Sequence, residues 1–408
     1  MRKVPELRFD GFDGEWEMGT LSDLGSVLMN KRIYKDETSE IGDVPFYKIG
    51  TFGSKADSYI SRDLFEEYKS KYPYPKVGDL LISASGSIGK VIEYKGEDAY
   101  YQDSNIVWLD VNDKVKNSFL KQFYETVNWN ELEGSTIKRL YNKDLLRKKI
   151  SYPKLSEQEK IGNLFKKLDD LIEIQEGKVT KMENFKKSML QKMFPKKGEL
   201  VPEFRFDGFE GEWKKLTLGD IGEVQSSGVN KIIYNNQKIV RLLNYMDVYN
   251  KKSPTNSNIA TFMETSASDK EMLSKDVIKG DIFFTPTSET AEDIGHSMVV
   301  EDDIKGMVYS YHIFRFRPNS DVLAINFSDY FCNVDPVRKQ LKIKAQGAQR
   351  YTLKLNDFRE LIIKLPPLEE QQKIGQFFKN LDTQIENEEK LLESYKCMKK
   401  SLLQKMFV

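Results

Sequence analysis

The stretch VPELRFDGFDGEW at residues 4–16 recurs as VPEFRFDGFEGEW at residues 201–213. Eleven of the thirteen positions are identical, and the two exceptions, at Leu7 and Asp13 of the first copy, are conservative. Amphipathic patterning fixes the polarity of a position but not its residue identity, so shared periodicity does not explain this match. The repeat therefore indicates an internal duplication, and we interpret the rest of the chain as two related halves.

A second pair of repeats closes each half. PKLSEQEKIGNLFKKLDDLI (153–172) resembles PPLEEQQKIGQFFKNLDTQI (366–385), and SMLQKMF (188–194) matches SLLQKMF (401–407) at six of seven positions. The opening motifs are 197 residues apart, whereas the closing repeats are 213 apart, so the second variable segment is 16 residues longer. The order along the chain is a variable segment, a repeated segment, a second variable segment and a second repeated segment.

Length and composition limit the class of protein. A chain of 408 residues predicts about two to three domains. The opening residues MRKVPELRFD lack an apolar signal core, and no run approaches the roughly 20 apolar residues of a membrane helix, which predicts a cytoplasmic protein with no membrane contact. Lys+Arg and Asp+Glu balance at 63 each, whereas nucleic-acid binders usually carry a basic excess. Any nucleic-acid contact must therefore depend on local patches or on the charge of a partner.

Cysteine and histidine are too scarce to organise the fold. The chain has Cys332, Cys397, His296 and His312, which excludes a disulfide framework and a Cys/His zinc site. The two histidines have no serine or cysteine at the spacing of a catalytic motif, so we interpret both as ordinary strand or loop residues. No metal site is expected in this chain.

Nucleotide and methyltransferase motifs are also absent. SGSIGK (85–90) resembles a phosphate loop, but Ala84 stands where glycine is required and Val91 follows the lysine. No G-x-G-x-x-G occurs, nor the [DNS]-P-P-[YFW] stretch with which amino-methyltransferases hold a flipped base. Residues 85–90 remain either a tight turn presenting backbone and hydroxyls (Ser85, Ser87) to a ligand or a purely structural hairpin. A chain without a catalytic constellation is predicted to be a recognition or scaffold protein.

The repeated closing segments predict two long helices. Apolar residues recur at steps of three and four over about five heptads, which indicates helices that pack on each other. Ser156 and Glu159 have capping-box spacing after Pro153. Each helix of roughly 38 residues would be about 57 Å long. Gln175 and Glu388 interrupt the apolar rows, where they either set the register or face water. The residues expected in the helix packing are Ile161, Leu168, Ile172, Met182, Ile374, Leu381, Ile385 and Tyr395.

The variable segments predict mixed α/β domains of one fold with divergent surfaces. Residues 75–94 and 277–300 each contain a Gly-Asp turn, a β-rich run, a polar loop and a second β-rich run. The further expected elements are strands at 105–111 and 311–318, helices at 118–132 and 328–342, and closing glycine-led stretches at 134–146 and 347–359.

Basic and amide side chains in loop-like surroundings are the candidates for DNA contact. Arg and Lys suit guanine edges and phosphates, while Gln and Asn pair with adenine. The strongest grouping lies beside the glycines of the two closing stretches. The candidates are Lys31, Arg32, Ser85, Ser87, Lys90, Lys138, Arg139, Lys231, Arg241, Gln346, Gln349, Arg350 and Tyr351.

With this duplicated order and these repeats, the chain resembles the specificity subunits of type I restriction–modification systems. The resemblance implies an α+β protein in which two target recognition domains are joined by two conserved helices packed as an antiparallel coiled coil. It would divide the chain into recognition domain 1 (1–152), helix 1 (153–196), recognition domain 2 (197–365) and helix 2 (366–408). Each domain would read one half-site of a bipartite, asymmetric DNA target, and the helices would set the spacer.

The resemblance also implies the partners. The subunit would have no catalytic activity and no cofactor of its own. It would bind double-stranded DNA and two modification subunits, which use S-adenosylmethionine to methylate adenine at N6, together with restriction subunits that require ATP and Mg²⁺. Two alternatives remain, a scaffold that pairs protein partners through its helices and a single-chain methyltransferase or nuclease. Trp16, Trp213, Phe9 and Phe206 of the opening motifs are interpreted as packing anchors.

Overall fold

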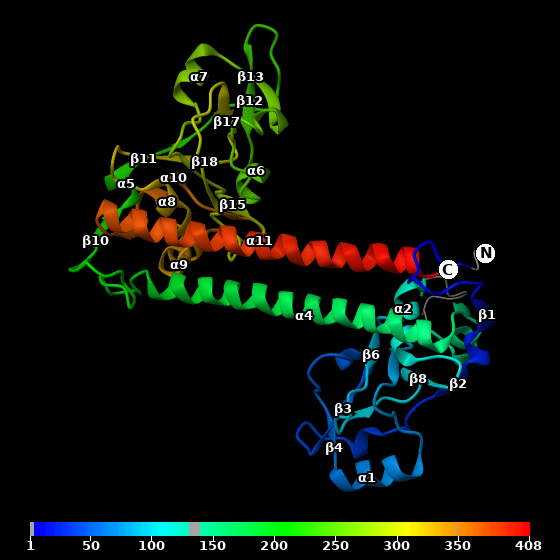
Figure 1. The fold of residues 1–408 in the computed structure, drawn as a ribbon. Helices are drawn as coiled ribbons and strands as arrows, with labels where there is room; N and C mark the ends of the chain where they lie inside the picture. The colour runs from blue at the N-terminus through cyan, green and yellow to red at the C-terminus, as the bar shows by residue number, and fades with distance from the viewer. Residues whose placement is uncertain (1–3, 130–138, 348) are drawn as a thin grey trace. The chain divides into compact units, whose positions relative to one another are not determined.

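The computed structural model describes residues 4–129, 139–347 and 349–408 (Figure 1). In the described part of the chain, no helix combines the length and apolarity needed to cross a membrane.

The chain divides into two compact units. Unit 1 contains Met1–Gly177 and Lys390–Val408, and unit 2 contains Lys178–Glu389. Each unit therefore combines one variable segment with parts of both long helices, α4 (Leu155–Lys192) and α11 (Leu368–Met406), which have 38 and 39 residues. The division into two recognition domains and two helices, expected from the sequence, stays a prediction.

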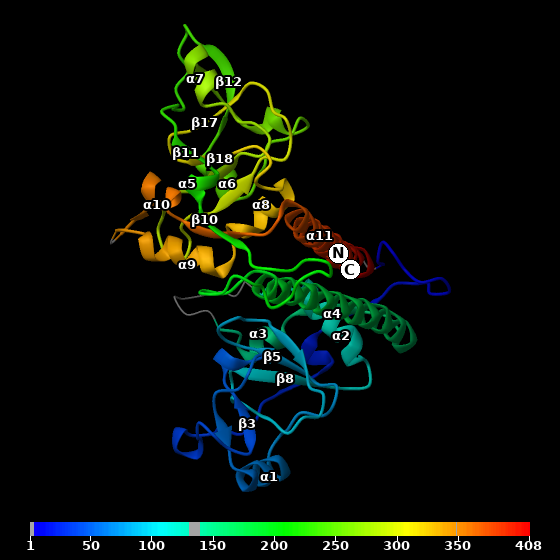
Figure 2. The same ribbon diagram turned by 90° about the vertical axis from the view of Figure 1, so that its left-hand side faces the viewer.

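The described residues of unit 1 form three small sheets. A four-stranded sheet has the order β2-β8-β5-β6, a three-stranded sheet has the order β4-β3-β7, and β1 pairs with β9. In both views the three-stranded sheet and α1 lie farther from α4 than the four-stranded sheet (Figures 1 and 2). The elements before α4 are β1 (Glu17–Thr20), β2 (Gly25–Leu28), β3 (Val44–Tyr47), β4 (Tyr59–Ile60), α1 (Arg62–Lys71), β5 (Leu80–Ser83), β6 (Val91–Glu93), β7 (Tyr100–Tyr101), β8 (Ile106–Val111), α2 (Asn117–Thr126), α3 (Asn142–Leu146) and β9 (Lys149–Tyr152).

Unit 2 repeats these sheets in the same order. Its sheets are β11-β18-β14-β16, β13-β12-β17 and β10-β20, with a further pair, β15-β19. The elements are β10 (Lys214–Thr217), α5 (Leu218–Ile221), β11 (Gly222–Ser226), β12 (Lys238–Leu243), α6 (Tyr245–Tyr249), β13 (Met263–Ala267), α7 (Asp269–Ser274), β14 (Ile282–Phe284), β15 (Thr287–Ser288), β16 (Ser297–Val299), β17 (Met307–Tyr309), β18 (Phe314–Pro318), α8 (Ile325–Phe331), α9 (Asp335–Lys344), β19 (Tyr351–Thr352), α10 (Leu355–Arg359) and β20 (Ile362–Leu365). The matching strand orders confirm that the halves share an α+β fold.

The opening motif is held to the helices by a buried ion pair. Arg8 donates from Nε and Nη2 to the Glu157 carboxylate at 2.7 Å each, and from Nη1 to the Gly14 carbonyl at 2.6 Å. Arg205 makes the same forked contact with Glu370 at 2.8 and 2.7 Å. Both glutamate side chains are 1% exposed, so the bidentate geometry compensates for their loss of hydration. This contact gives the arginine of the repeat a structural role.

Aromatic contacts complete the anchor in each unit. Trp16 is 3% exposed and its ring centroid lies 6.2 Å from that of Phe407, while Trp213 is 1% exposed and lies 5.8 Å from Phe194. Phe407 follows α11 and Phe194 follows α4, so each motif contacts the C-terminal end of a different long helix. The tryptophans are packing anchors, as the sequence predicts.

The two helices run antiparallel within each unit. In unit 1, Asp169 pairs with Lys399 at 2.7 Å and Glu176 pairs with Lys396 at 2.6 Å, so numbers rise along α4 as they fall along α11. In unit 2, Lys178 pairs with Glu388 at 2.6 Å and Lys186 pairs with Asp382, which gives the same antiparallel direction. Of the residues expected in the helix packing, Ile161, Leu168, Ile374, Leu381 and Ile385 are buried, and Ile172, Met182 and Tyr395 are half-buried.

A glycine in each long helix permits close packing. A Cβ at Gly162 would lie 2.6 Å from Ser118 Cβ, and a Cβ at Gly375 would lie 2.6 Å from the Phe327 nitrogen. The repeated Ile-Gly pair therefore lets α2 and α8 approach their long helices.

Two expectations about helix ends are wrong. The predicted helix at 328–342 is divided, because α8 ends at Phe331 and a new helix, α9, begins at Asp335 with Pro336 in its first turn. Ser156 does not cap α4, because the helix begins one residue earlier, at Leu155.

A repeated glutamine holds the start of each long helix instead. The Gln158 side chain accepts from the Lys116 nitrogen at 2.8 Å and donates to the Pro153 carbonyl at 2.8 Å. Gln371 donates to the Pro366 carbonyl in the same manner, at 3.0 Å. The predicted helix at 118–132 corresponds to α2, which ends at Thr126, and its last three residues lie outside the described part.

Candidate nucleic-acid interface

In unit 1, three separate segments meet at the end of β5. The Leu140 nitrogen donates to the Ala84 carbonyl at 2.8 Å, and the Ala84 nitrogen donates to the Asn105 carbonyl at 2.7 Å. Arg139 Nη2 donates to the Ser104 carbonyl at 2.9 Å. These bonds join the loop after β5, the loop after β7 and the glycine-led stretch into one loop cluster. Lys138, predicted to take part, lies outside the described residues.

The SGSIGK loop belongs to this cluster. Ser85 Oγ donates to Asn105 Oδ1 at 2.8 Å, and Ser87 is exposed. Lys90 is exposed, and its Nζ donates to the Phe52 carbonyl at 2.7 Å. Gly89 faces Trp129, since a Cβ there would lie 2.2 Å from the indole Cδ1. The loop is a tight turn that leaves hydroxyls and one ammonium at the surface.

Unit 2 forms an equivalent loop cluster. The Leu353 nitrogen donates to the Pro286 carbonyl at 2.8 Å, which reproduces the bond between Leu140 and Ala84. The glycine-led stretch then pairs with the loop after β14, as Ser288 faces Tyr351 in the β15-β19 ladder. The glycine-led stretches of the two units, which the sequence predicts to be equivalent, are therefore bonded in the same way to the loops after β5 and β14.

Cationic side chains gather at the unit 2 cluster. Arg350 is exposed and its Nη2 lies 3.5 Å from Thr287 Oγ1. The pKa of His312 is lowered by partial burial and by the positive charges of Lys231 and Arg350. Gln346 and Gln349 are exposed, and Tyr351 is half-buried. His312, which the sequence predicts to be an ordinary strand or loop residue, lies in the loop between β17 and β18.

The remaining candidates differ in their surroundings. Lys31 lies 5.2 Å from the Tyr72 ring centroid, and Arg32 pairs with Asp103 at 3.0 Å. Arg241 is used within the three-stranded sheet, where it pairs with Glu264 on β13 at 3.0 Å. Arg32 therefore adjoins the unit 1 cluster, Lys31 lies beside Tyr72, and Arg241 supports a strand.

The two clusters are fixed by different contacts. In unit 2 the Tyr249 hydroxyl donates to Asp293 Oδ2 at 2.8 Å, and His296 Nε2 lies 2.6 Å from Asp293 Oδ1. The Tyr245 hydroxyl donates to the Thr287 carbonyl at 2.6 Å. These contacts attach β15 and the loop between β15 and β16 to the two tyrosines of α6. Trp129 packs against the corresponding glycine-containing turn of unit 1.

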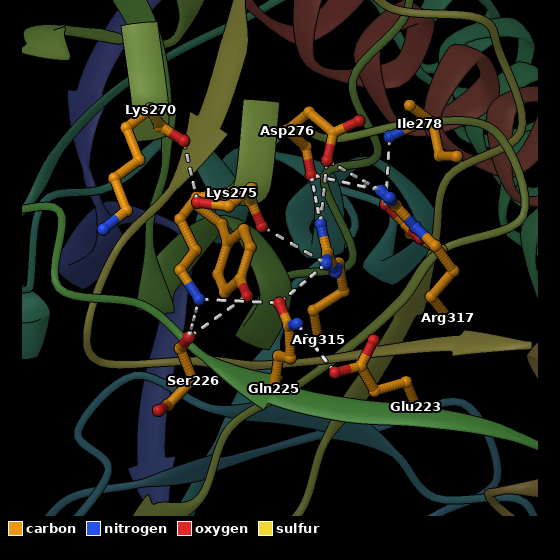
Figure 3. Close-up of polar contacts among 12 residues, drawn as sticks. Glu223, Gln225, Ser226, Lys270, Lys275, Asp276, Ile278, Arg315 and Arg317 are labelled. Carbon is orange, nitrogen blue, oxygen red and sulfur yellow. Dashed lines mark hydrogen bonds and ion pairs between the residues drawn. The ribbon is translucent and has the colours of Figure 1, made fainter. Parts of the chain in front are cut away.

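An ionic cluster that contains the buried side chains of Arg315 and Asp281 lies between the two larger sheets of unit 2 (Figure 3). Arg315, which is 3% exposed, donates to Asp276 Oδ1 at 3.0 Å and to Gln225 Oε1 at 2.8 Å. Arg317 donates to Asp276 Oδ1 at 3.1 Å and to Asp281 Oδ1 at 2.7 Å. Burial raises the pKa of Asp281 although Arg317 opposes the rise.

The cluster joins the three-stranded sheet of unit 2 to its four-stranded sheet. Lys275 Nζ donates to the Ser226 carbonyl at 2.8 Å, and burial beside Arg315 lowers the pKa of this lysine. The Arg315 guanidinium lies 5.2 Å from the Tyr309 ring centroid. Since these charges are used internally, the cluster supports the fold and leaves the loops as the candidate contact surface. Among the described residues, no three His, Cys, Asp or Glu side chains form a group able to hold a metal ion.

Comparison with known proteins accounts for the duplication. The family model of the type I restriction modification DNA specificity domain matches residues 13–184 and again residues 210–394. The chain belongs to this family. Both matches run from an opening motif into a long helix, so each unit of this specificity subunit carries one copy of the domain.

Relatives of this specificity subunit carry corresponding names. It is 25% identical over 426 residues to the putative type I restriction enzyme MjaX specificity subunit of Methanocaldococcus jannaschii, which covers 95% of this chain and 92% of the relative. It is 55% identical over 153 residues to the putative type I restriction enzyme specificity subunit S.HindORF215P of Haemophilus influenzae, and this match spans 37% of the chain and 40% of the relative.

Solved structures share the fold at low identity. The type I restriction-modification S subunit from M. genitalium gives a TM-score of 0.62 at 16% identity and covers 99% of both chains. A chain from a structure described for complex assembly and conformational transition of the type I R-M system gives a TM-score of 0.54 at 13% identity, with 96% of this chain and 97% of that chain covered.

Proposed function

We propose that this specificity subunit reads a bipartite, asymmetric DNA target, with one half-site bound by the loop cluster of each unit. The observation that carries the proposal is the pair of equivalent clusters, each assembled from three separate segments on the same sheet frame. Their exposed side chains differ, with Ser87 and Lys90 in unit 1 and Gln349 and Arg350 in unit 2. Different donors and acceptors on one frame suit two half-sites of different base sequence.

Direct contact to bases is assigned to the exposed groups of these clusters. Arg350 can present a bidentate fork to guanine, and Gln346 and Gln349 can pair with adenine. Ser85, Ser87 and Arg139 occupy the corresponding surface in unit 1. Tyr351 and Arg241 are assigned supporting positions, since they belong to β-ladders.

The proposed partners follow from membership in the family. Two modification subunits would supply S-adenosylmethionine and methylate adenine at N6, and restriction subunits would use ATP and Mg²⁺. This chain itself would be non-catalytic and would act as the scaffold, with its helices setting the number of base pairs between half-sites. A helix of 38 residues is about 57 Å long, compared with the 34–36 Å that separates half-sites one DNA turn apart. The neutral net charge predicts weak DNA binding without these partners.

A protein scaffold without DNA contact is the alternative function. It would use the same helices, but it would leave the two loop clusters without a ligand. Specific methylation separates the two functions.

The test is a map of N6-methyladenine in the host genome with and without the gene. We expect one asymmetric bipartite sequence to lose methylation completely in the deletion strain and to regain it when the gene is restored. An unchanged methylation map would overturn the proposed function. Methylation by the purified chain alone would show that it is an enzyme.

A further inference from the structure

A five-residue sequence survives inside the divergent segments of both units. Asn-Lys-Arg-Ile-Tyr occupies residues 30–34, and Asn-Lys-Ile-Ile-Tyr occupies residues 230–234. Each copy follows the first strand of a four-stranded sheet and leads toward the three-stranded sheet, in an extended segment without regular structure. We call these copies the NKxIY segments.

The repeated lysine and tyrosine are exposed in both units. Lys31 and Lys231 are exposed, and neither forms an ion pair with any residue in the described part of the chain. Tyr34 is 59% exposed and Tyr234 is 43% exposed. Exposed positions ordinarily diverge after duplication, because few contacts restrain them.

Internal packing does not account for the identities. Asn30 is buried and its Nδ2 donates to the Pro73 carbonyl at 3.3 Å, whereas Asn230 donates to the Tyr234 hydroxyl at 3.3 Å. The same residues therefore make different internal contacts in the two units. By contrast, the other short repeat in the variable segments, the Gly-Asp turn, has its aspartates buried and bonded alike: the Lys76 nitrogen donates to Asp79 at 2.7 Å, and the same bond recurs in unit 2.

Both NKxIY segments adjoin the loop clusters. In unit 1, Arg32 within the segment pairs with Asp103 in the loop after β7 at 3.0 Å. In unit 2, the Val229 carbonyl, immediately before the segment, accepts from the Tyr311 nitrogen in the equivalent loop at 3.1 Å. A ligand on either loop cluster would therefore extend over the neighbouring NKxIY segment.

The ligand that two different half-sites have in common is the sugar–phosphate backbone. We propose that the NKxIY segments bind the DNA phosphates at both half-sites, through the ammonium groups of Lys31 and Lys231 and the hydroxyls of Tyr34 and Tyr234, whatever bases the loop clusters read. Lysine, as a point charge, and tyrosine, as a neutral donor, are both suited to phosphate oxygens. This inference rests on the proposed function and assigns the repeated exposed residues to affinity and the divergent ones to specificity.

The test measures the salt dependence of DNA binding by the full-length chain assembled with its modification subunits. Lys31→Ala, Lys231→Ala and the double variant are compared on the specific duplex and on a duplex of equal length with scrambled half-sites. Each lysine is expected to reduce the slope of log K against log [salt] by about 0.9. Affinity for both duplexes should fall by the same factor, since phosphates carry no sequence information.

Matched controls exist in both units. Lys95 and Lys305 are exposed and each precedes a glycine in the turn before the last strand of a three-stranded sheet, whereas the loop clusters follow that strand. Lys95→Ala and Lys305→Ala are expected to leave the slope unchanged. Tyr34→Phe and Tyr234→Phe should lower the affinity for both duplexes by the same factor. They should leave the salt slope unchanged, because a neutral donor displaces no counterion.

The outcomes are distinct. A slope altered no more than in the lysine controls would overturn the inference, as would a selective loss of affinity for the specific duplex. Failure of the unmodified complex to prefer the specific duplex would overturn the proposed function as well. The fold is retained in a variant if its thermal unfolding has the same midpoint temperature as that of the wild type.

Discussion

The two units have side chains of different chemistry at equivalent positions of their four-stranded sheets. Counted from the glycines that begin β2 and β11, Trp108 of unit 1 corresponds to Arg315 of unit 2, and Asp110 corresponds to Arg317. Trp108 is 1% exposed in an aromatic cluster, whereas Arg315 is 3% exposed in an ionic one. The frame therefore depends on strand pairing rather than on one type of interior.

The anchors show the reverse pattern. Arg8 with Glu157 and Arg205 with Glu370 have the same forked geometry in both units. Contacts that hold a recognition domain to the helices have been kept, while the side chains at the positions of Trp108 and Asp110 have been exchanged for Arg315 and Arg317. Divergence of the interior leaves the loops above it free to present different groups.

The largest expected effect comes from breaking an anchor. Arg8→Met leaves the nearly unexposed Glu157 carboxylate without its partner, which should lower the free energy of unfolding by about 3–5 kcal/mol. Arg205→Met should have the same effect through Glu370. Scanning calorimetry of the full chain measures both.

The double variant Arg8→Met/Glu157→Met is the control, because it removes the stranded charge along with the pair. It should recover most of the lost stability. Unequal losses in the two single variants would show that the anchors are not equivalent.

A smaller effect distinguishes the two interiors. Arg317→Met should destabilise by about 2–4 kcal/mol, because Asp281 is fully buried and would lose its forked partner. In unit 1, burial and, to a smaller extent, the negative charge of the corresponding Asp110 raise the pKa of Asp79. Asp110→Asn should therefore change stability by less than about 0.5 kcal/mol.

Urea denaturation checks this pair of variants. Addition of Asp281→Asn to Arg317→Met should restore part of the stability, since the buried charge is then gone. A loss from Asp110→Asn as large as that from Arg317→Met would contradict the contrast between the interiors.

The pH dependence of stability is expected to differ between the units where α2 and α8 pack against the long helices. Lys121 of α2 pairs with Asp169 at 3.2 Å, but Asp329 takes the corresponding place in α8. Asp329 borders a cavity of about 370 Å³, and burial, with the nearby Glu301 and Asp382, raises its pKa to about 6. The folded state therefore binds the proton more tightly than the unfolded state, whose reference value is 3.8.

The contribution of Asp329 to stability is consequently present below about pH 4 and is lost as the pH rises through about 6. Asp329→Asn should stabilise the protein by about 1–3 kcal/mol at pH 7.5 and by little at pH 4. Unfolding midpoints across this range measure the difference. An equal gain at both pH values would show that Asp329 acts through packing instead of through its charge.

The features that the sequence predicted correctly are those that the duplication repeats in both halves. The two long helices, the shared fold and the buried tryptophans all follow from matched patterns in the two halves. The partner of Arg8 could not be predicted, because Glu157 is 149 residues away and lies in a helix rich in other carboxylates. The sequence predicted one helix at 328–342 because its periodicity continues across the break before Asp335.

The candidate site was predicted only in part. The glycine-led stretches were grouped correctly because both have turn residues at equivalent places. Arg241 was indistinguishable in sequence from a surface cation, although Glu264 on the next strand engages it. The proximity of His312 to Lys231 and Arg350 depends on tertiary packing, for which the sequence carries no local signal.

The central claim is that the two units share one fold and recognise their half-sites independently. The most direct test is the methylation map of a strain that carries Arg350→Ala. Arg350 is exposed and lies 3.5 Å from Thr287 Oγ1, so its removal should leave the fold intact. The account predicts that discrimination against the wrong base falls by about 1–3 kcal/mol at one base pair of one half-site. The other half-site and the spacer should be unchanged. Relaxation of both half-sites, or an unaltered target, would contradict it.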